Sequence, residues 1–143
     1  MADSNKHILR RIADEVVNGG NLAAADTLLG REYVFHGPGG LELRGPDGFK
    51  QMIGMYQTAF PDFHVVIEDM VEEGDRIAFR LTVRGTHRGD LAGVAPTGKS
   101  VIVSTIIISR FAGGKCVEEW QTVDEVSLFR QLGVTTLPAA AHA

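Results

Sequence analysis

The sequence predicts one α+β domain, in which helices pack on one face of a curved antiparallel sheet. Amphipathic helical segments come first, and apolar residues recur at helical spacing between Ile8 and Val16. Long strand-like segments then follow one another from residue 63 to residue 123, separated by turns rich in glycine. The 143 residues suffice for one hydrophobic core and are too few for two, so we treat 1–143 as a single domain with a flexible tail at 134–143.

Helix boundaries follow from capping residues. Ser4 has a hydroxyl that can accept an early backbone N–H, so the first helix begins there and ends at Asn18-Gly19-Gly20. A second, short helix is expected over Leu22–Leu29. The third begins at Gly45-Pro46-Asp47, because proline is favoured in a first helical turn, and ends before Pro61. Asp124 is the expected N-cap of a last helix that ends at Gly133.

Strands are predicted where branched and aromatic residues gather between turn residues. The turn Glu73-Gly74-Asp75 joins two of these segments in a hairpin, and Ala112-Gly113-Gly114 joins two others. The predicted strands are Glu32–His36, Leu41–Arg44, Phe63–Val71, Arg76–Gly85, Ser100–Phe111 and Cys116–Val123.

Composition excludes several functional classes. A net charge of −4 offers no basic surplus for nucleic acid. The longest apolar run, Val101–Ile108, is far shorter than the ~20 residues that span a bilayer, and no signal peptide opens the chain. The single cysteine, Cys116, excludes an internal disulfide, and the five histidines show no metal-binding spacing. We expect a cytoplasmic protein without a metal site.

The segment Val101–Ile108 (VIVSTIII) is apolar on both faces of the predicted strand. An antiparallel strand with one face in water should alternate between apolar and polar residues. One face is expected to meet the helices, and a second subunit is the simplest cover for the other. We therefore predict a homodimer formed through the sheet; the alternative is a central strand covered by its own chain.

Several motifs resemble the SnoaL-like polyketide cyclase family, within the NTF2-like fold, a cone of sheet and helices around a pocket. They span most of the chain in the family's order. The similar stretches are Gly45–Tyr56 (GPDGFKQMIGMY), Ala59–Asp62 (AFPD), Glu68–Asp75 (EDMVEEGD), Val83–His87 (VRGTH), Pro96–Lys99 (PTGK) and Gly114–Gly133 (GKCVEEWQTVDEVSLFRQLG).

The resemblance implies a cofactor-independent enzyme that closes a ring by intramolecular aldol condensation on a small, hydrophobic, polyketide-like carbonyl compound. In the family the base is an aspartate directly after the position of Trp120, where this chain has Gln121. A neutral amide donates and accepts hydrogen bonds but cannot act as a general base. The family's partner histidine aligns with Ile107, and the polar position two before it is Thr105.

Strand alternation suggests a substitute base. If Gln121 faces the pocket, then Glu119 and Val117 do so too, while Glu118 and Trp120 face away. Thr105, Ile107 and Ser109 share the pocket face on the neighbouring strand. A carboxylate buried among apolar side chains has a raised pKa, which suits a general base, so Glu119 is the catalytic candidate. Its alternative role is a solvated or arginine-paired residue at the pocket rim.

Four further residues complete the candidate set. His36 ends a strand beside a glycine-rich turn, and the resemblance implies that the pocket opens there. It either shuttles a proton or hydrogen-bonds a ligand at the pocket, or it bonds to backbone. Arg84 either binds a substrate oxygen or forms an ion pair. Tyr56 can place its phenol in the pocket, while Met52 lines the pocket or fills the core. The loop Arg88–Gly98 has glycine hinges and could cover the pocket.

Three functional hypotheses follow. The first is a SnoaL-like enzyme that works by acid–base catalysis with Glu119 and His36. The second is a non-catalytic ligand-binding protein that kept the pocket and lost the base. The third is epoxide hydrolysis, as in the related NTF2-like limonene epoxide hydrolase, although the middle strand lacks one of the two aspartates used there. The orientation of Glu119 discriminates between the first two hypotheses.

Overall fold

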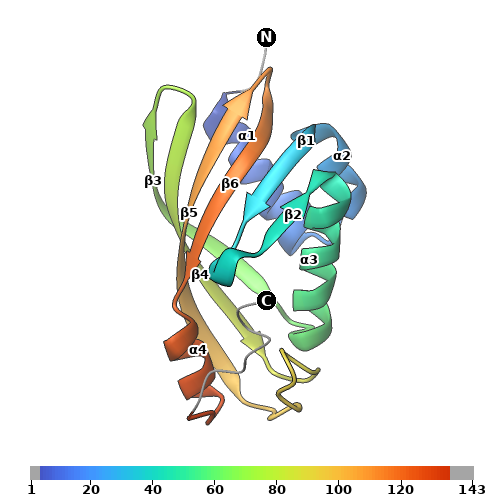
Figure 1. The fold of residues 1–143 in the computed structure, drawn as a ribbon, viewed down its shortest axis with the longest axis vertical. Helices are drawn as coiled ribbons and strands as arrows, with labels where there is room; N and C mark the ends of the chain where they lie inside the picture. Colours follow the sequence, from blue (N-terminus) through green and yellow to red (C-terminus); the bar gives the residue numbers. More distant parts are fainter. Residues whose placement is uncertain (1–3, 136–143) are drawn as a thin grey trace.

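The computed structural model describes residues 4–135, so most of the expected flexible tail lies outside the described residues. A six-stranded sheet in the order β2-β1-β6-β5-β4-β3 forms one wall of the molecule (Figure 1). The strands are β1 (Leu29–His36), β2 (Glu42–Arg44), β3 (His64–Glu73), β4 (Arg76–Thr86), β5 (Ser100–Ala112) and β6 (Lys115–Val123). The helical segments are α1 (Asn5–Arg11), η1 (Ile12–Asn18), η2 (Leu22–Ala24), α2 (Ala25–Leu28), α3 (Gly45–Ala59) and α4 (Glu125–Gln131), with a short turn η3 (Pro38–Gly40).

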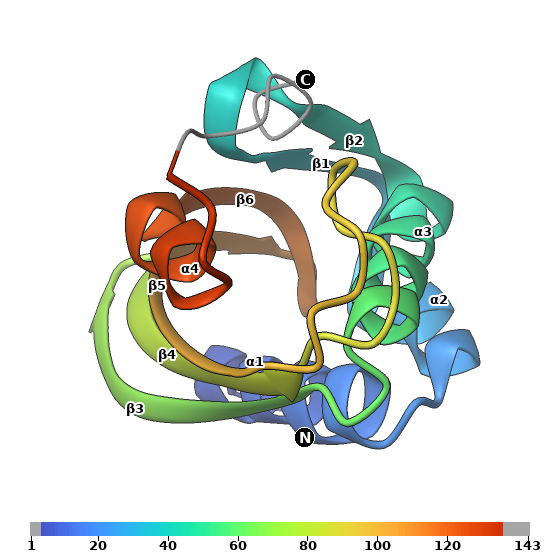
Figure 2. The same cartoon turned by 90° about the horizontal axis from the view of Figure 1, so that it is seen from below.

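The sheet curls, and α3 stands on the opposite side from β4 and β5 (Figure 2). This arrangement confirms the predicted α+β fold. Four of the five strand pairings are antiparallel, as expected, but β1 pairs with β6 in parallel. That pairing sets Phe35 beside Glu119 and His36 beside Trp120. The first and the last strand along the chain thus lie side by side in the middle of the sheet.

The first helix begins as predicted, because the Ser4 hydroxyl accepts the backbone N–H of His7 at 3.1 Å. Its last seven residues form a π-helix, η1, which the apolar spacing did not predict. The Asn18 amide ends this helix: it donates to the Val65 carbonyl and accepts the Val65 N–H, both at 2.8 Å. These two bonds tie the helix to β3 and fix one wall of the interior.

A β-bulge interrupts the pairing of β5 and β6. Arg110 pairs with Glu118, but the next residue, Phe111, pairs with Cys116, so Val117 is the extra residue on β6. The alternation of β6 shifts by one at this point. Cys116 is therefore fully buried, and Val117 does not face the interior in the way that simple alternation predicts.

The loop between β4 and β5 is held by His87, which is fully buried. Its Nδ1 accepts the backbone N–H of Thr97 at 3.2 Å, and its own backbone bonds to Lys99 and Gly98 at 2.9 and 2.8 Å. His87 thus joins the two ends of the loop, through its ring to Thr97 and through its backbone to Gly98 and Lys99.

The two faces of β5 differ in exposure. Val101, Val103, Thr105 and Ile107 are buried toward the helices. On the other face Ile102, Ile106 and Ile108 are 56%, 53% and 39% exposed. The described part of the chain thus leaves an apolar stripe uncovered on the outer face of the sheet, where the sequence predicted that a second subunit would lie.

Candidate active site

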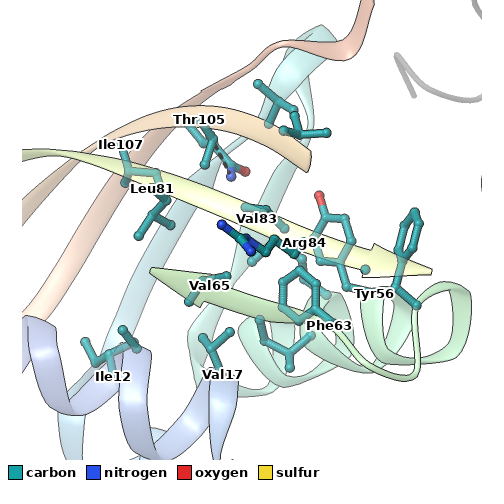
Figure 3. Close-up of a pocket in the computed structure, with 18 of the residues that line it drawn as sticks. Ile12, Val17, Tyr56, Phe63, Val65, Leu81, Val83, Arg84, Thr105 and Ile107 are labelled. Carbon is teal, nitrogen blue, oxygen red and sulfur yellow. Dashed lines mark hydrogen bonds between the residues drawn. The ribbon is translucent and has the colours of Figure 1, made fainter. Parts of the chain in front are cut away.

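An apolar cavity of about 130 Å³ lies between the concave face of the sheet and the helices (Figure 3). Ile12 and Val17 of η1 form one side of the cavity, and Thr105 and Ile107 of β5 lie across from them. A second, wider cavity of about 810 Å³ adjoins it. The residues that line both cavities are Met52, Tyr56, Val123 and Leu128.

Glu119 is the carboxylate of the inner cavity. It is 4% exposed, and it lies opposite Ser109 on β5 and Phe35 on β1. The Tyr33 hydroxyl donates to Oε1 at 2.7 Å, and the Ser109 hydroxyl donates to Oε2. Burial raises the pKa of Glu119, while the hydrogen bonds from Ser109 and Tyr33 lower it and leave a net increase. The expected rise of its pKa is confirmed.

Gln121 and Thr105 form a short hydrogen-bonded chain on the cavity wall. The Thr105 hydroxyl donates to the backbone carbonyl of Thr122 at 2.9 Å. The Gln121 amide nitrogen, Nε2, donates to the Thr105 oxygen at 3.2 Å. Gln121 Oε1 is buried and has no hydrogen-bond partner among residues 4–135. The predicted pocket residues Gln121, Thr105 and Ile107 are therefore brought together beside Glu119.

Tyr56 and Met52 line the cavity from α3, as their positions on that helix suggested. The ring of Tyr56 stacks on Phe63, with 5.5 Å between centroids and 7° between planes. Burial raises the pKa of the Tyr56 phenol, so it stays protonated and can donate a hydrogen bond. Because both residues also line the wider cavity, they lie at the boundary between the two cavities.

Arg84 borders the cavity but is exposed. It pairs with His64 and with Ile102, both of which are exposed, whereas its neighbour Val83 pairs with the buried Val65 and Val103. The alternation of β4 therefore directs the Arg84 side chain to the outer face of the sheet. Arg84 is nevertheless among the residues that line the cavity (Figure 3), and its role in substrate binding stays a prediction.

His36 lies on the outer face as well, and it does not line either cavity. Its ring stacks on Trp120, with 5.5 Å between centroids, and its Nε2 lies 2.8 Å from Glu118 Oε2. Arg110 bonds to the other oxygen of Glu118 at 3.0 Å. The hydrogen bond to His36 and the Arg110 guanidinium hold the pKa of Glu118 below its usual value. The expectation that His36 stands beside the pocket is corrected: the sheet separates it from Glu119.

Tyr33 is a site residue that the sequence reasoning missed. It is fully buried, and its hydroxyl reaches Glu119 from a strand 86 positions away in sequence. A signal was present, because Tyr33 and Phe35 alternate on one face of the predicted first strand and therefore must face the core together. The same alternation places His36 on the opposite face.

Residues 4–135 contain no group of three or more His, Cys, Asp or Glu side chains placed to hold a metal ion. In the same part of the chain, no helix has the length and apolar character needed to cross a bilayer.

Comparison with known proteins identifies related chains. The family described as SnoaL-like polyketide cyclase matches residues 7–132. Aklanonic acid methyl ester cyclase DnrD of Streptomyces peucetius is 29% identical over 131 residues, which cover 88% of each chain. The corresponding cyclase AcmA of Streptomyces galilaeus is 31% identical over 123 residues, covering 83% of this chain and 84% of AcmA. The crystal structure of wild-type IdmH from Streptomyces antibioticus matches with a TM-score of 0.82 and 30% identity, covering 92% of this chain and 100% of IdmH.

Proposed function

Because the chain belongs to the SnoaL-like polyketide cyclase family, we propose that it catalyses cofactor-independent ring closure of a hydrophobic, polyketide-like carbonyl compound with Glu119 as the base. One observation carries the proposal: Glu119 is a carboxylate buried in the wall of an otherwise apolar cavity. A general base needs a raised pKa and exclusion of water, and burial supplies both. DnrD and AcmA are named as cyclases of aklanonic acid methyl ester, so a polyketide ester is the substrate class to test first.

The proposed reaction is an isomerisation with no co-reactant. Glu119 takes a proton from a carbon next to a carbonyl group, which leaves an enolate. The enolate carbon then bonds to a second carbonyl carbon of the same molecule, and the resulting alkoxide takes the proton back from Glu119. Tyr56 can donate to the enolate oxygen, because it lines the cavity and its phenol stays protonated.

The two hydrogen bonds to Glu119 support this role. Tyr33 and Ser109 both donate to the carboxylate, so they hold its plane fixed and favour the ionised form that accepts a proton. A general base that is already oriented loses no rotational freedom when the reaction begins. These donors thus limit the rise in pKa that burial alone would cause.

The test is turnover of a panel of polyketide methyl esters by Glu119→Gln, with Glu118→Gln as the matched control. The amide cannot take a proton, so we expect kcat to fall by about 10²- to 10⁴-fold, the usual contribution of a general base. Glu118→Gln should stay close to the unmodified protein, because Glu118 faces away from the cavity. Unchanged turnover in Glu119→Gln would remove it as the base.

A second candidate function is ligand binding without catalysis. It is favoured by the fact that both oxygens of Glu119 already have donors within the protein and the group is 4% exposed. A carboxylate so engaged can serve as a structural link between β1, β5 and β6. Turnover of no ester in the panel, together with tight binding of the same esters, would favour this function.

We also propose a homodimer formed through the outer face of the sheet. The exposed isoleucines of β5 form an apolar stripe in the middle of the sheet, and such surfaces usually mark an interface. A second copy would cover the stripe with the same stripe, as twofold symmetry requires. The oligomeric state of an outer-face variant, described in the Discussion, tests this proposal.

A further inference from the structure

Gln121 presents a single acceptor to the cavity, and the orientation of its amide is fixed by its neighbours. A hydroxyl has one hydrogen to donate, and that of Thr105 is used on the Thr122 carbonyl at 2.9 Å. Toward Gln121 the Thr105 oxygen can only accept. The amide must therefore turn its N–H to Thr105, at 3.2 Å, and its carbonyl oxygen away. Oε1 is left buried without a partner in the described part of the chain.

An unpaired buried acceptor is unusual in a folded protein. Most buried polar atoms have a hydrogen-bond partner, because removal from water without compensation is costly. The walls around Gln121 offer little compensation: it pairs with Ile107, and Val103, Val123 and Leu128 line the same cavity. The missing partner is therefore expected to come from the molecule that enters the cavity.

We propose that Gln121 Oε1 selects ligands that carry a hydrogen-bond donor, a phenolic or enolic hydroxyl, on an otherwise apolar ring. The inference deepens the proposed function, on which it rests, because it concerns the substrate of the same cavity. A hydroxyl placed there satisfies Oε1, whereas a methyl group in its place leaves the acceptor buried and unpaired. Sites built in this way discriminate strongly against analogues that lack the donor.

The position of Gln121 suits such a role. It lies two residues after Glu119 on β6, and both side chains line the inner cavity. Two residues along a strand span roughly 6.5–7 Å, about the width of a fused-ring unit. A hydroxyl held by Oε1 would thus set which carbon of the ring system faces Glu119. Gln121 acts in this scheme as a specificity residue, and Glu119 as the base.

The test measures binding of a matched pair, 2-naphthol and 2-methylnaphthalene, by isothermal titration calorimetry at neutral pH. The two probes have the same shape and differ in one hydroxyl. Selectivity is the Kd of the methyl compound divided by that of the naphthol, and Gln121→Leu removes the acceptor. The two probes differ in hydrophobicity, but this difference is the same for both proteins and cancels when their ratios are compared. We expect the ratio to fall at least about tenfold in Gln121→Leu.

Two controls locate the effect. Gln57→Leu makes the same substitution on α3 at a residue that lines neither cavity, and it should leave the ratio unchanged. Thr105→Val removes the acceptor that fixes the amide. The Gln121 amide can then rotate and present its N–H, so the preference for naphthol should weaken and binding of 2-acetylnaphthalene, an acceptor, should strengthen.

The outcomes separate this inference from the proposed base. Glu119→Gln should keep the preference for naphthol over methylnaphthalene even if it loses turnover. A preference that disappears in Glu119→Gln but persists in Gln121→Leu would mean that Glu119 binds the hydroxyl, and it would overturn the inference. An unchanged ratio in Gln121→Leu, or no measurable binding of either probe by the unmodified protein, would also overturn it. Near-ultraviolet circular dichroism confirms that each variant is folded before its ratio is used.

Discussion

Glu118 and Glu119 are neighbours in sequence and have opposite electrostatic surroundings. Glu118 lies on the outer face of the sheet, where His36 and Arg110 hold its pKa below the usual value. Glu119 lies on the inner face, where burial raises its pKa. The strand separates a carboxylate that is hydrogen-bonded by Arg110 and His36 from one that is held by neutral hydroxyl donors. The chemistry of each glutamate is set by the face that it occupies.

Ile106 and Ile107 on β5 are also identical neighbours that lie on opposite faces of the sheet. Ile106 is 53% exposed on the outer face, and Ile107 is 8% exposed on the inner face. The outer position is available to a second molecule, and the inner one forms the wall of the cavity. These two pairs of identical neighbours allow each face to be tested with the other as its control.

The largest expected effect comes from a charge placed on β5. Ile107→Asp would bury an unpaired carboxylate, and we expect it to lower the free energy of unfolding by about 4 kcal/mol or more. Ile106→Asp should change monomer stability by no more than about 0.5 kcal/mol, because its side chain is half exposed. Urea denaturation measures both.

Ile106→Asp also tests the proposed dimer, which light scattering after size-exclusion chromatography can follow. We expect the unmodified protein to elute as a dimer and Ile106→Asp as a folded monomer. A monomeric unmodified protein would contradict the dimer through the sheet, and so would a variant that remains dimeric.

A smaller loss is expected from Tyr33→Phe, which removes one donor to Glu119 and keeps the ring. The buried Oε1 is left unpaired, so we expect stability to fall by about 1–3 kcal/mol. Loss of this hydrogen bond also removes an influence that lowers the pKa of Glu119. If Glu119 is the base, the acidic limb of the kcat/KM profile should move to higher pH. An acidic limb at the same pH would show that kcat/KM does not depend on the ionisation of Glu119.

The smallest effects are the opposite pH dependences of stability at the two glutamates. The pKa of Glu119 is higher in the folded protein than its ordinary value of 4.5. Between pH 4.5 and the folded pKa, the folded state therefore binds more protons than the unfolded state. Stability from this group is present below pH 4.5 and is lost as the pH rises through the folded pKa. At neutral pH, Glu119→Gln should therefore be more stable than the unmodified protein, by roughly 1 kcal/mol.

Glu118 has the reverse sign. Its folded pKa is lower than its ordinary value of 4.5, so its stabilisation is present above that pH and is lost as the pH falls through the folded pKa. Glu118→Gln should lower stability at neutral pH by less than about 1 kcal/mol, since the pair is partly exposed. Guanidinium denaturation between acidic and neutral pH measures both variants. Shifts of the same sign at the two positions would contradict the assignment of the faces.

The order of helices and strands could be predicted from the sequence because its signals are local. Ser4 and Asp124 cap helices where the sequence places them, and the turns of the two hairpins are rich in glycine. The parallel pairing of β1 with β6 could not be predicted in this way. It joins segments more than 80 residues apart, and no local pattern records which strands become neighbours.

In the candidate site, too, some residues could be placed from local sequence patterns and others depend on which strands pair. Glu119, Gln121 and Thr105 could be placed together because alternation along two paired strands assigns them to one face. His36 was assigned to the pocket from its position beside a turn, although the alternation of Tyr33 and Phe35 indicates the outer face. The Tyr33 hydroxyl reaches Glu119 only through the parallel pairing, so its role is a property of the fold.

The bulge at Val117 has a consequence for how such a site can be gained or lost. If Val117 paired within the ladder and no residue were bulged, the register set by the tight turn would pair Ile107 with Trp120 in place of Gln121, since Phe111 pairs with Cys116. A shift of one residue exchanges the two faces of a strand. Glu118, Trp120 and Thr122 would then point inward, and the two residues assigned to base and specificity would point to solvent. A change in pairing by one residue could thus exchange one complete set of functional groups for another with every amino acid unchanged, whereas deletion of Val117 would close the bulge and keep Ile107 opposite Gln121.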